Sequence, residues 1–170
     1  MTNPVIRTLT AFALLAALVS SFGKSTEAAT PKTVTGPTAL ALAAVIAQHS
    51  PLLSAYEKKV IAGLFNGNAN AGAAAKKKLS ITADSVVCKV SNVDLTARSC
   101  EIIFKAGKST SLKGREANEV FATLAMAGVA SDGAAGSIFE TVKKLNCSLD
   151  PAVIKDKSGG GADCSFETEG

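Results

Sequence analysis

The sequence predicts the α+β class, with a small antiparallel sheet of two disulfide-stapled hairpins packed against about three helices. Two observations lead to this class. The four cysteines fall into two local pairs, and each pair flanks a turn-rich connection beside segments in which apolar residues alternate. Other segments carry apolar residues at helical spacing. Along the chain, the predicted elements follow in the order helix, helix, hairpin, helix, hairpin. This order is typical of helices on one face of an antiparallel sheet.

Residues 1–28 have the layout of a secretory signal peptide. Arg7 precedes a short apolar run, and small residues follow that run. A cut after Ala28 fits the small-residue rule, and a cut after Gly23 is the alternative. A spanning helix needs about 20 apolar residues, so this run is too short to be a membrane anchor. We therefore expect an exported protein, periplasmic or extracellular.

The charge and composition narrow the class of partner. Removing residues 1–28 takes away two basic residues and one acidic residue, so the net charge falls from +4 to +3. A charge this small argues against a nucleic-acid partner, which needs a clustered basic face. The chain has no Trp and one Tyr, which argues against an aromatic ligand platform. A chain of this length fits one domain, which we place at residues 37–170, after a flexible segment at residues 29–36.

Residues 37–48 predict a helix that is apolar on nearly every face. Pro37 suits the first helical position. A helix that is apolar all round is either buried or in contact with lipid, and twelve residues are too few to span a membrane. Burial against the sheet is the favoured interpretation, and contact with lipid or a partner is the alternative. Burial would place four side chains inside: Leu40, Leu42, Val45 and Ile46.

A second helix follows the break at residues 49–51. Ser50 is a candidate N-cap, with Pro51 at the first helical position. Four apolar residues then recur at helical spacing: Leu53, Tyr56, Val60 and Leu64. Gly67 ends this helix, and a low-complexity segment leads from it to the first strand.

The first cysteine pair predicts a hairpin. Apolar residues alternate with polar ones around Cys88 and again around Cys100, a period of two that indicates half-buried strands. Between them, Asn92 and Asp94 favour a turn. With Asp94 at the centre, Cys88 faces Cys100. Residues 109–112 then predict a third strand, and residues 115–129 a third helix.

The second cysteine pair predicts a looser copy of this arrangement. Residues 138–149 read as a strand, the glycine-rich segment 158–161 as a flexible connection, and residues 164–166 as a returning strand. Cys147 should therefore bond Cys164. Both disulfides follow the pattern of exported proteins, and each ring of this size contributes about 3 kcal/mol.

The spacing of the cysteines argues against metal and redox chemistry. Thiol exchange uses close pairs such as C-x-x-C, and zinc sites use close pairs or histidines. The chain has one histidine, His49, and no recognisable nucleophile arrangement beside it. We expect no metal and no cofactor, and the sequence singles out no catalytic residue.

The leading functional hypothesis is a small exported binding or inhibitor-like module without enzymatic activity. Its partner would be another exported or envelope protein. Loops on a rigid scaffold commonly carry binding residues, and five candidates lie in two such loops: Asn92, Asp94, Thr96, Ser131 and Asp132. One alternative is a cell-envelope hydrolase that uses carboxylates such as Glu116, Glu140 or Asp132. Another is a structural envelope protein that contacts lipid through residues 37–48.

Overall fold

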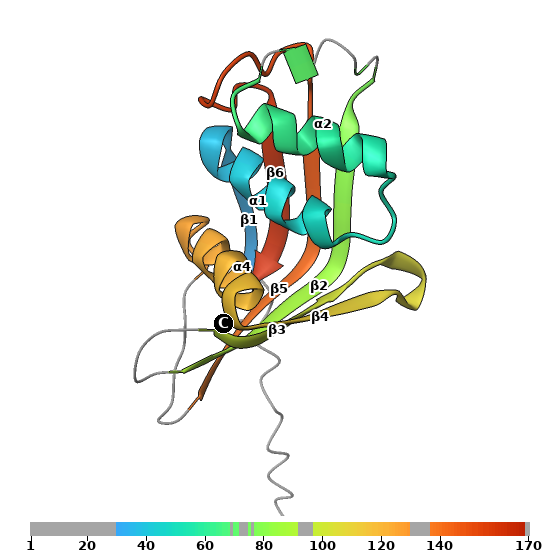
Figure 1. The fold of residues 1–170 in the computed structure, drawn as a ribbon. Helices are drawn as coiled ribbons and strands as arrows, with labels where there is room; N and C mark the ends of the chain where they lie inside the picture. The colour runs from blue at the N-terminus through green and yellow to red at the C-terminus, as the bar shows by residue number, and fades with distance from the viewer. Residues whose placement is uncertain are drawn as a thin grey trace, which may run out of the picture.

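Six strands form one antiparallel sheet, and three helices cover one face of it in the part of the chain that the structure describes (Figure 1). The computed structural model describes residues 30–68, 70–71, 75, 77–91, 97–129 and 137–168. The strands are β1 (Thr30–Thr35), β2 (Leu79–Ser91), β3 (Ala97–Ile103), β4 (Ser109–Lys113), β5 (Ser137–Leu149) and β6 (Ala162–Thr168). The helices are α1 (Gly36–His49), α2 (Ala55–Phe65) and α4 (Gly114–Met126), and a short 3₁₀ turn, Lys105–Gly107, precedes β4.

The predicted α+β class and its two stapled hairpins are confirmed. Strands β2 and β3 form the first hairpin, and β5 and β6 form the second. The two hairpins join through the long central pair β2–β5, and the edge strands β1 and β4 extend the sheet to the order β1-β6-β5-β2-β3-β4.

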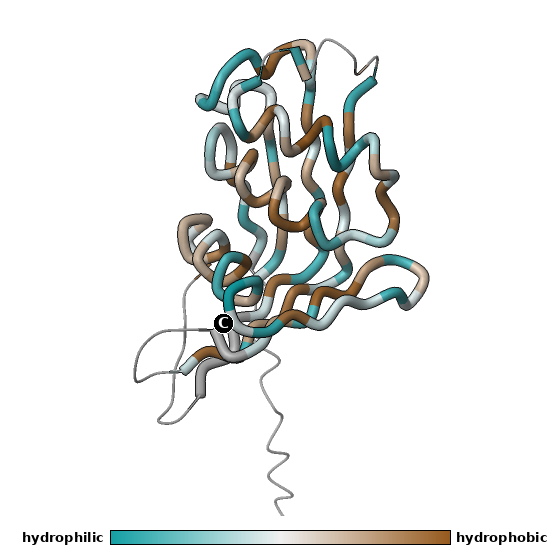
Figure 2. Tube along the Cα trace, in the orientation of Figure 1, coloured by the Kyte–Doolittle hydropathy of each residue, from teal (hydrophilic) through white to brown (hydrophobic). Residues whose placement is uncertain are grey.

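The two faces of the sheet differ in polarity. The face under the helices buries apolar residues of the central strands, such as Val86 and Leu145. The opposite face exposes polar residues, among them Ser80, Asn146 and Ser165. Along the strands, polar and apolar residues alternate (Figure 2). This pattern is typical of an antiparallel sheet with one solvated face, so the core lies wholly on the helical side.

Strand β1 corrects the expectation of a flexible segment at residues 29–36. Residues 30–35 pair with β6 along their whole length, and Val34 lies opposite Cys164. This strand is polar apart from Val34 and the edge residue Pro31, which is why no alternating pattern stands out in it. Short polar edge strands of this kind limit pairing with other chains.

Helix α1 is buried against the sheet, as the favoured interpretation predicts. Leu40, Leu42 and Ile46 are almost fully buried. The prediction for Val45 is wrong, because this side chain is only half-buried and lies on the opposite face of the helix. Glycine is suited to residue 36, where β1 passes directly into α1, because its φ is +69°.

Helix α2 begins later than predicted. Its N-cap is Ser54, not Ser50, and Ser54 and Glu57 form a reciprocal capping box. The hydroxyl of Ser50 instead accepts a hydrogen bond from the Leu52 amide at 3.2 Å, within the turn between the two helices. The turn therefore extends through residues 50–54 before the second helix starts.

The sheet consists of two halves with the same plan. In each half a long central strand, a disulfide-linked strand and an edge strand lie side by side, and the edge strand passes through a positive-φ glycine into a helix. One half is β2-β3-β4-α4, with Gly114 at the junction; the other is β5-β6-β1-α1, with Gly36 there. The second half is discontinuous in sequence, because β1-α1 opens the described chain and β5-β6 closes it.

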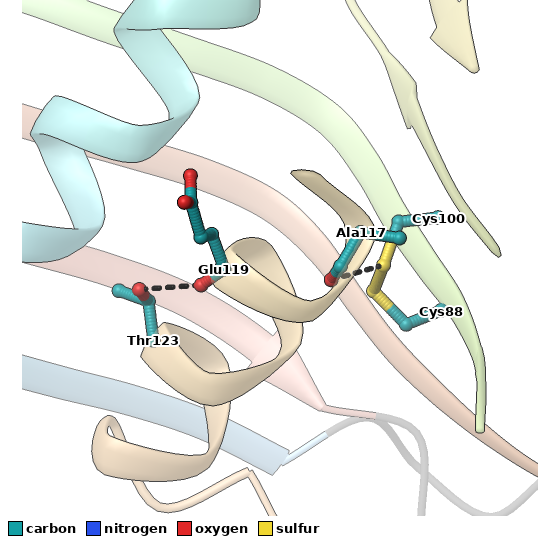
Figure 3. The surroundings of a disulfide bond; sticks show 5 residues. All are labelled: Cys88, Cys100, Ala117, Glu119 and Thr123. Atoms are coloured by element: carbon teal, nitrogen blue, oxygen red, sulfur yellow. Dashed lines mark hydrogen bonds between the residues drawn. A yellow bond between two sulfur atoms is a disulfide. The ribbon is translucent and has the colours of Figure 1, made fainter. Parts of the chain in front are cut away.

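Each disulfide packs under the helix of its own half. Cys100 Sγ lies 3.3 Å from the carbonyl oxygen of Ala117 in α4, as Figure 3 shows, and Cys164 Sγ lies 3.4 Å from that of Ala39 in α1. A disulfide sulfur carries no proton, so these are packing contacts and not donated hydrogen bonds. Both alanines lie three residues after the junction glycine, which extends the correspondence to side-chain packing.

Candidate functional site

All four cysteines serve as structural staples. Cys88 is bonded to Cys100 and Cys147 to Cys164, as predicted, and each pair lies directly opposite in its hairpin. All four are at most 1% exposed. Buried, oxidised cysteines offer no thiolate for metal binding or nucleophilic attack. Intramolecular disulfides of this kind are typical of exported proteins.

The predicted loop contacts lie outside the described residues. This holds for Asn92, Asp94 and Thr96 at the first hairpin tip and for Ser131 and Asp132 after α4. They stay predictions.

The hydrolase carboxylates do not come together in the described part of the chain. Asp132 is outside it, as is the side chain of Glu140. Glu116 is exposed near the start of α4. Among the described residues, no group of three or more His, Cys, Asp or Glu side chains is placed to hold a metal ion.

A groove lies on the helical side of the sheet, between α1, α2 and α4. Its volume is about 740 Å³. Helix α1 forms the floor with Ala41, Ala44 and Val45, while α2 and α4 form the two walls. The floor is open because two of these three side chains are single methyl groups, which leave space between longer residues on the flanking helices. We call this hollow the three-helix groove.

Large apolar side chains stand on both walls of the groove. Phe65 on α2 is 45% exposed and Met126 on α4 is 65% exposed, and both line the hollow. Ala62 and Ala122 add apolar surface beside them. Single exposed apolar residues are ordinary, but here several of them line one concave surface, which makes the groove the candidate ligand site.

Polar groups gather where α1 ends. Lys58 donates a hydrogen bond from Nζ to the backbone oxygen of Gln48 at 3.1 Å, which satisfies a carbonyl in the last turn of α1. On the other wall, Arg115 Nε lies 2.9 Å from Glu119 Oε1. The hydroxyl of Thr123 is also occupied, since it donates to the Glu119 backbone oxygen at 2.8 Å (Figure 3).

His49 lies at the same end of α1 but has no catalytic setting. Burial lowers its pKa from the usual value of 6.5; Glu116 and Glu119 oppose this shift and Lys58 adds to it. Its Nε2 is buried and has no hydrogen-bond partner among the described residues. Among the described residues, a buried imidazole with a lowered pKa and no hydrogen-bond partner at Nε2 fits a packing role.

Comparisons of the chain with family models, with curated proteins and with solved structures found no match. Among the described residues, no helix is both long and apolar enough to cross a membrane.

The groove could not be predicted from the sequence, because residues from three separate segments line it. The one local indication lies in residues 37–48. This segment is apolar on more faces than burial against the sheet alone requires.

Proposed function

We propose that this protein is an exported binding module without enzymatic activity, and that it takes an apolar ligand in the three-helix groove. The observation that carries the proposal is the groove itself, with about 740 Å³ of space above an alanine floor. Ligand sites in proteins have volumes of roughly 300–1,000 Å³ and are lined mostly by apolar side chains. The groove meets both conditions.

The stapled sheet supports this role by holding the floor in place. Cys164 packs against the carbonyl of Ala39, so the second disulfide lies directly under the first turn of α1. Helix α1 in turn carries the floor residues on its other face. Binding sites work best on rigid elements, and a disulfide-linked sheet under a buried helix is such an element.

Two observations support export of this binding module. The two disulfides are stable in an oxidising compartment, and residues 1–28 carry the secretory layout. The expectation that helix 37–48 lies on a membrane is the weaker alternative, because its most apolar side chains face the sheet. What remains accessible on that helix is the groove floor.

A neutral fluorescent probe for apolar sites, N-phenylnaphthylamine, tests the proposal. We expect saturable binding of one probe per protein. Ala122→Phe should abolish it by filling the groove, whereas Ala125→Phe should not, because Ala125 is exposed on the same helix but does not line the hollow. No saturable binding by the parent protein, or equal loss in both variants, would contradict the assignment.

A further inference from the structure

We propose that the ligand of the three-helix groove is a single-chain amphipathic anion, a free long-chain carboxylate. Its acyl chain would lie along the alanine floor and its carboxylate would meet Lys58 and Lys59. This inference rests on the proposed function and specifies the class of ligand. It follows from the direction of the groove, the charges at one end of it and the shape of its floor.

The groove has a polar end and a mostly apolar end, where Asn66 lines it beside Phe65 and Met126. Helices α1 and α2 are joined by the short turn at residues 50–54 and run in opposite directions (Figure 1). Lys58 therefore lies at the C-terminal end of α1, where it bonds Gln48. Phe65 lies seven residues further along α2, about 10 Å away at 1.5 Å per residue. A ligand that spans the groove meets a cation at one end and aromatic or aliphatic surface at the other.

The polar end carries a net positive charge. Lys58 and Lys59 both line the groove, and in the described part of the chain neither has a carboxylate within 4.0 Å. The lining acid, Glu119, is already paired with Arg115. An ammonium group has three donors, and the bond to Gln48 uses only one donor of Lys58. Donors therefore remain for the oxygens of a carboxylate.

The floor suits a flexible acyl chain. Ala41, Ala44 and Val45 form an aliphatic strip between the two walls. The one tyrosine of the chain, Tyr56, lines a neighbouring hollow that shares Lys59 with the groove. An unbranched acyl chain can follow such a strip and contact Phe65 and Met126 along its length.

Displacement of the neutral probe from the exported protein tests this ligand class. The competitors are hexadecanoate, hexadecanol and the hexadecyltrimethylammonium cation, all at low ionic strength. We expect the carboxylate to displace the probe at about one tenth of the concentration that the alcohol needs, and the cation to be weakest, because exposed charges attract or repel across a partly solvated site. Shorter carboxylates should weaken by at most about fourfold per methylene removed.

Two lysine variants locate the head group. Lys59→Gln should remove most of the preference for carboxylate over alcohol while leaving binding of the neutral probe unchanged. Lys58→Gln should act in the same way, but it also removes a bond to α1, so its thermal stability is measured in parallel. A control pair of exposed lysines away from the groove, Lys105→Gln with Lys108→Gln, should leave the preference intact.

The outcomes separate this inference from the proposed function. Equal displacement by carboxylate and alcohol, with the probe still bound in the groove, would overturn the anion assignment and leave the binding module standing. Failure of the neutral probe to bind would remove both. Binding confined to intact vesicles of anionic phospholipid, with no effect of free hexadecanoate, would overturn the free carboxylate in favour of a membrane surface.

Discussion

The two halves of the sheet share one plan, but among the described residues only the half β5-β6-β1-α1 has a second helix, α2, packed on its first helix. In β2-β3-β4-α4, the helix packs on its disulfide and turns a polar side, with Arg115 and Glu116, to water. In β5-β6-β1-α1, the helix packs on its disulfide in the same way but is apolar on both sides. Helix α2 then covers part of that second apolar side, and the remainder is the groove floor.

The difference shows how a binding surface can arise from a repeated unit. An amphipathic helix such as α4 is complete when one face is buried. Helix α1 has two apolar faces. The sheet covers one of them, and α2 and α4 cover only the margins of the other. The residual opening is therefore a consequence of composition: counted from the junction glycines, α1 has Ala41 where α4 has Glu119.

Removal of a disulfide should give the largest effect on stability, and a similar effect in each half. We expect Cys88→Ala with Cys100→Ala to lower the free energy of unfolding by about 3 kcal/mol, because a ring of roughly this size constrains the unfolded chain by that amount. Cys147→Ala with Cys164→Ala closes a slightly longer ring, 17 against 12 residues apart, and should cost slightly more. Urea unfolding measures both. A cost near zero in either half would contradict the structural role of that staple.

Two glycine substitutions should separate the halves more sharply, one at Gly159, which packs on the junction glycine Gly36, and one at the other junction glycine, Gly114. A Cβ at Gly159 would lie 2.4 Å from the backbone carbon of Gly36, and the φ of Gly159 is +67°. Gly159→Ala should therefore cost about 3 kcal/mol, from overpacking and the left-handed backbone. Gly114→Ala in the other half meets nothing within 4 Å and should cost about 1 kcal/mol, for the backbone alone. Thermal melts of the two variants would contradict this if Gly114→Ala were the worse.

His49 should make the stability of the α1 half depend on pH. Burial lowers its pKa in the folded state, so the unfolded chain binds the proton more readily. Its contribution to stability is then complete above its unfolded pKa of about 6.5 and is lost as the pH falls through that value toward the lower folded pKa. In His49→Gln this part of the pH dependence of the free energy of unfolding should vanish. If urea titrations between pH 7.5 and 5.5 gave the same pH dependence for the variant as for the parent, other groups would be responsible for it.

Circular permutation should have the smallest effect and would test whether the second half is one unit. Thr30 lies opposite Thr168, so the described ends of the chain meet in the β1–β6 pair. A short Gly-rich linker there, with new ends opened at residues 130–136, would place β5-β6-β1-α1 in continuous order. We expect a folded protein with both disulfides and a melting temperature close to that of the parent. Loss of the cooperative transition would show that the parental order is required.

The hairpins could be predicted from sequence because their information is local. Alternating apolar residues and the spacing of Cys88 and Cys100 about Asp94 set both strand and partner. The observed register agrees as far as Lys89 opposite Ser99, and beyond that pair it is shifted by one residue. The pattern at residues 30–35 was weak, because an edge strand with a solvated face needs few apolar residues. Ser54 was missed as N-cap although Glu57 stands three residues later, the spacing of a capping box.

The groove could not be predicted because no local pattern encodes it. Val45 is as apolar as its buried neighbours, and only the packing of α2 and α4 on either side of α1 decides that it faces the hollow. Lys58 and Glu119 lie far apart in the chain and meet through tertiary structure alone. Sequence reasoning placed function in loops because loops commonly carry it.

Backbone amide chemical shifts during titration with hexadecanoate would test the central claim most directly. The three-helix groove as ligand site predicts saturable shifts at Ala41, Ala44, Lys59 and Ala122, while the open face of the sheet, at Ser80, Asn146 and Ser165, stays unchanged. Ala122→Phe should erase these shifts and Ala125→Phe should preserve them. Shifts centred on the open face of the sheet, or shifts that survive Ala122→Phe, would contradict the account.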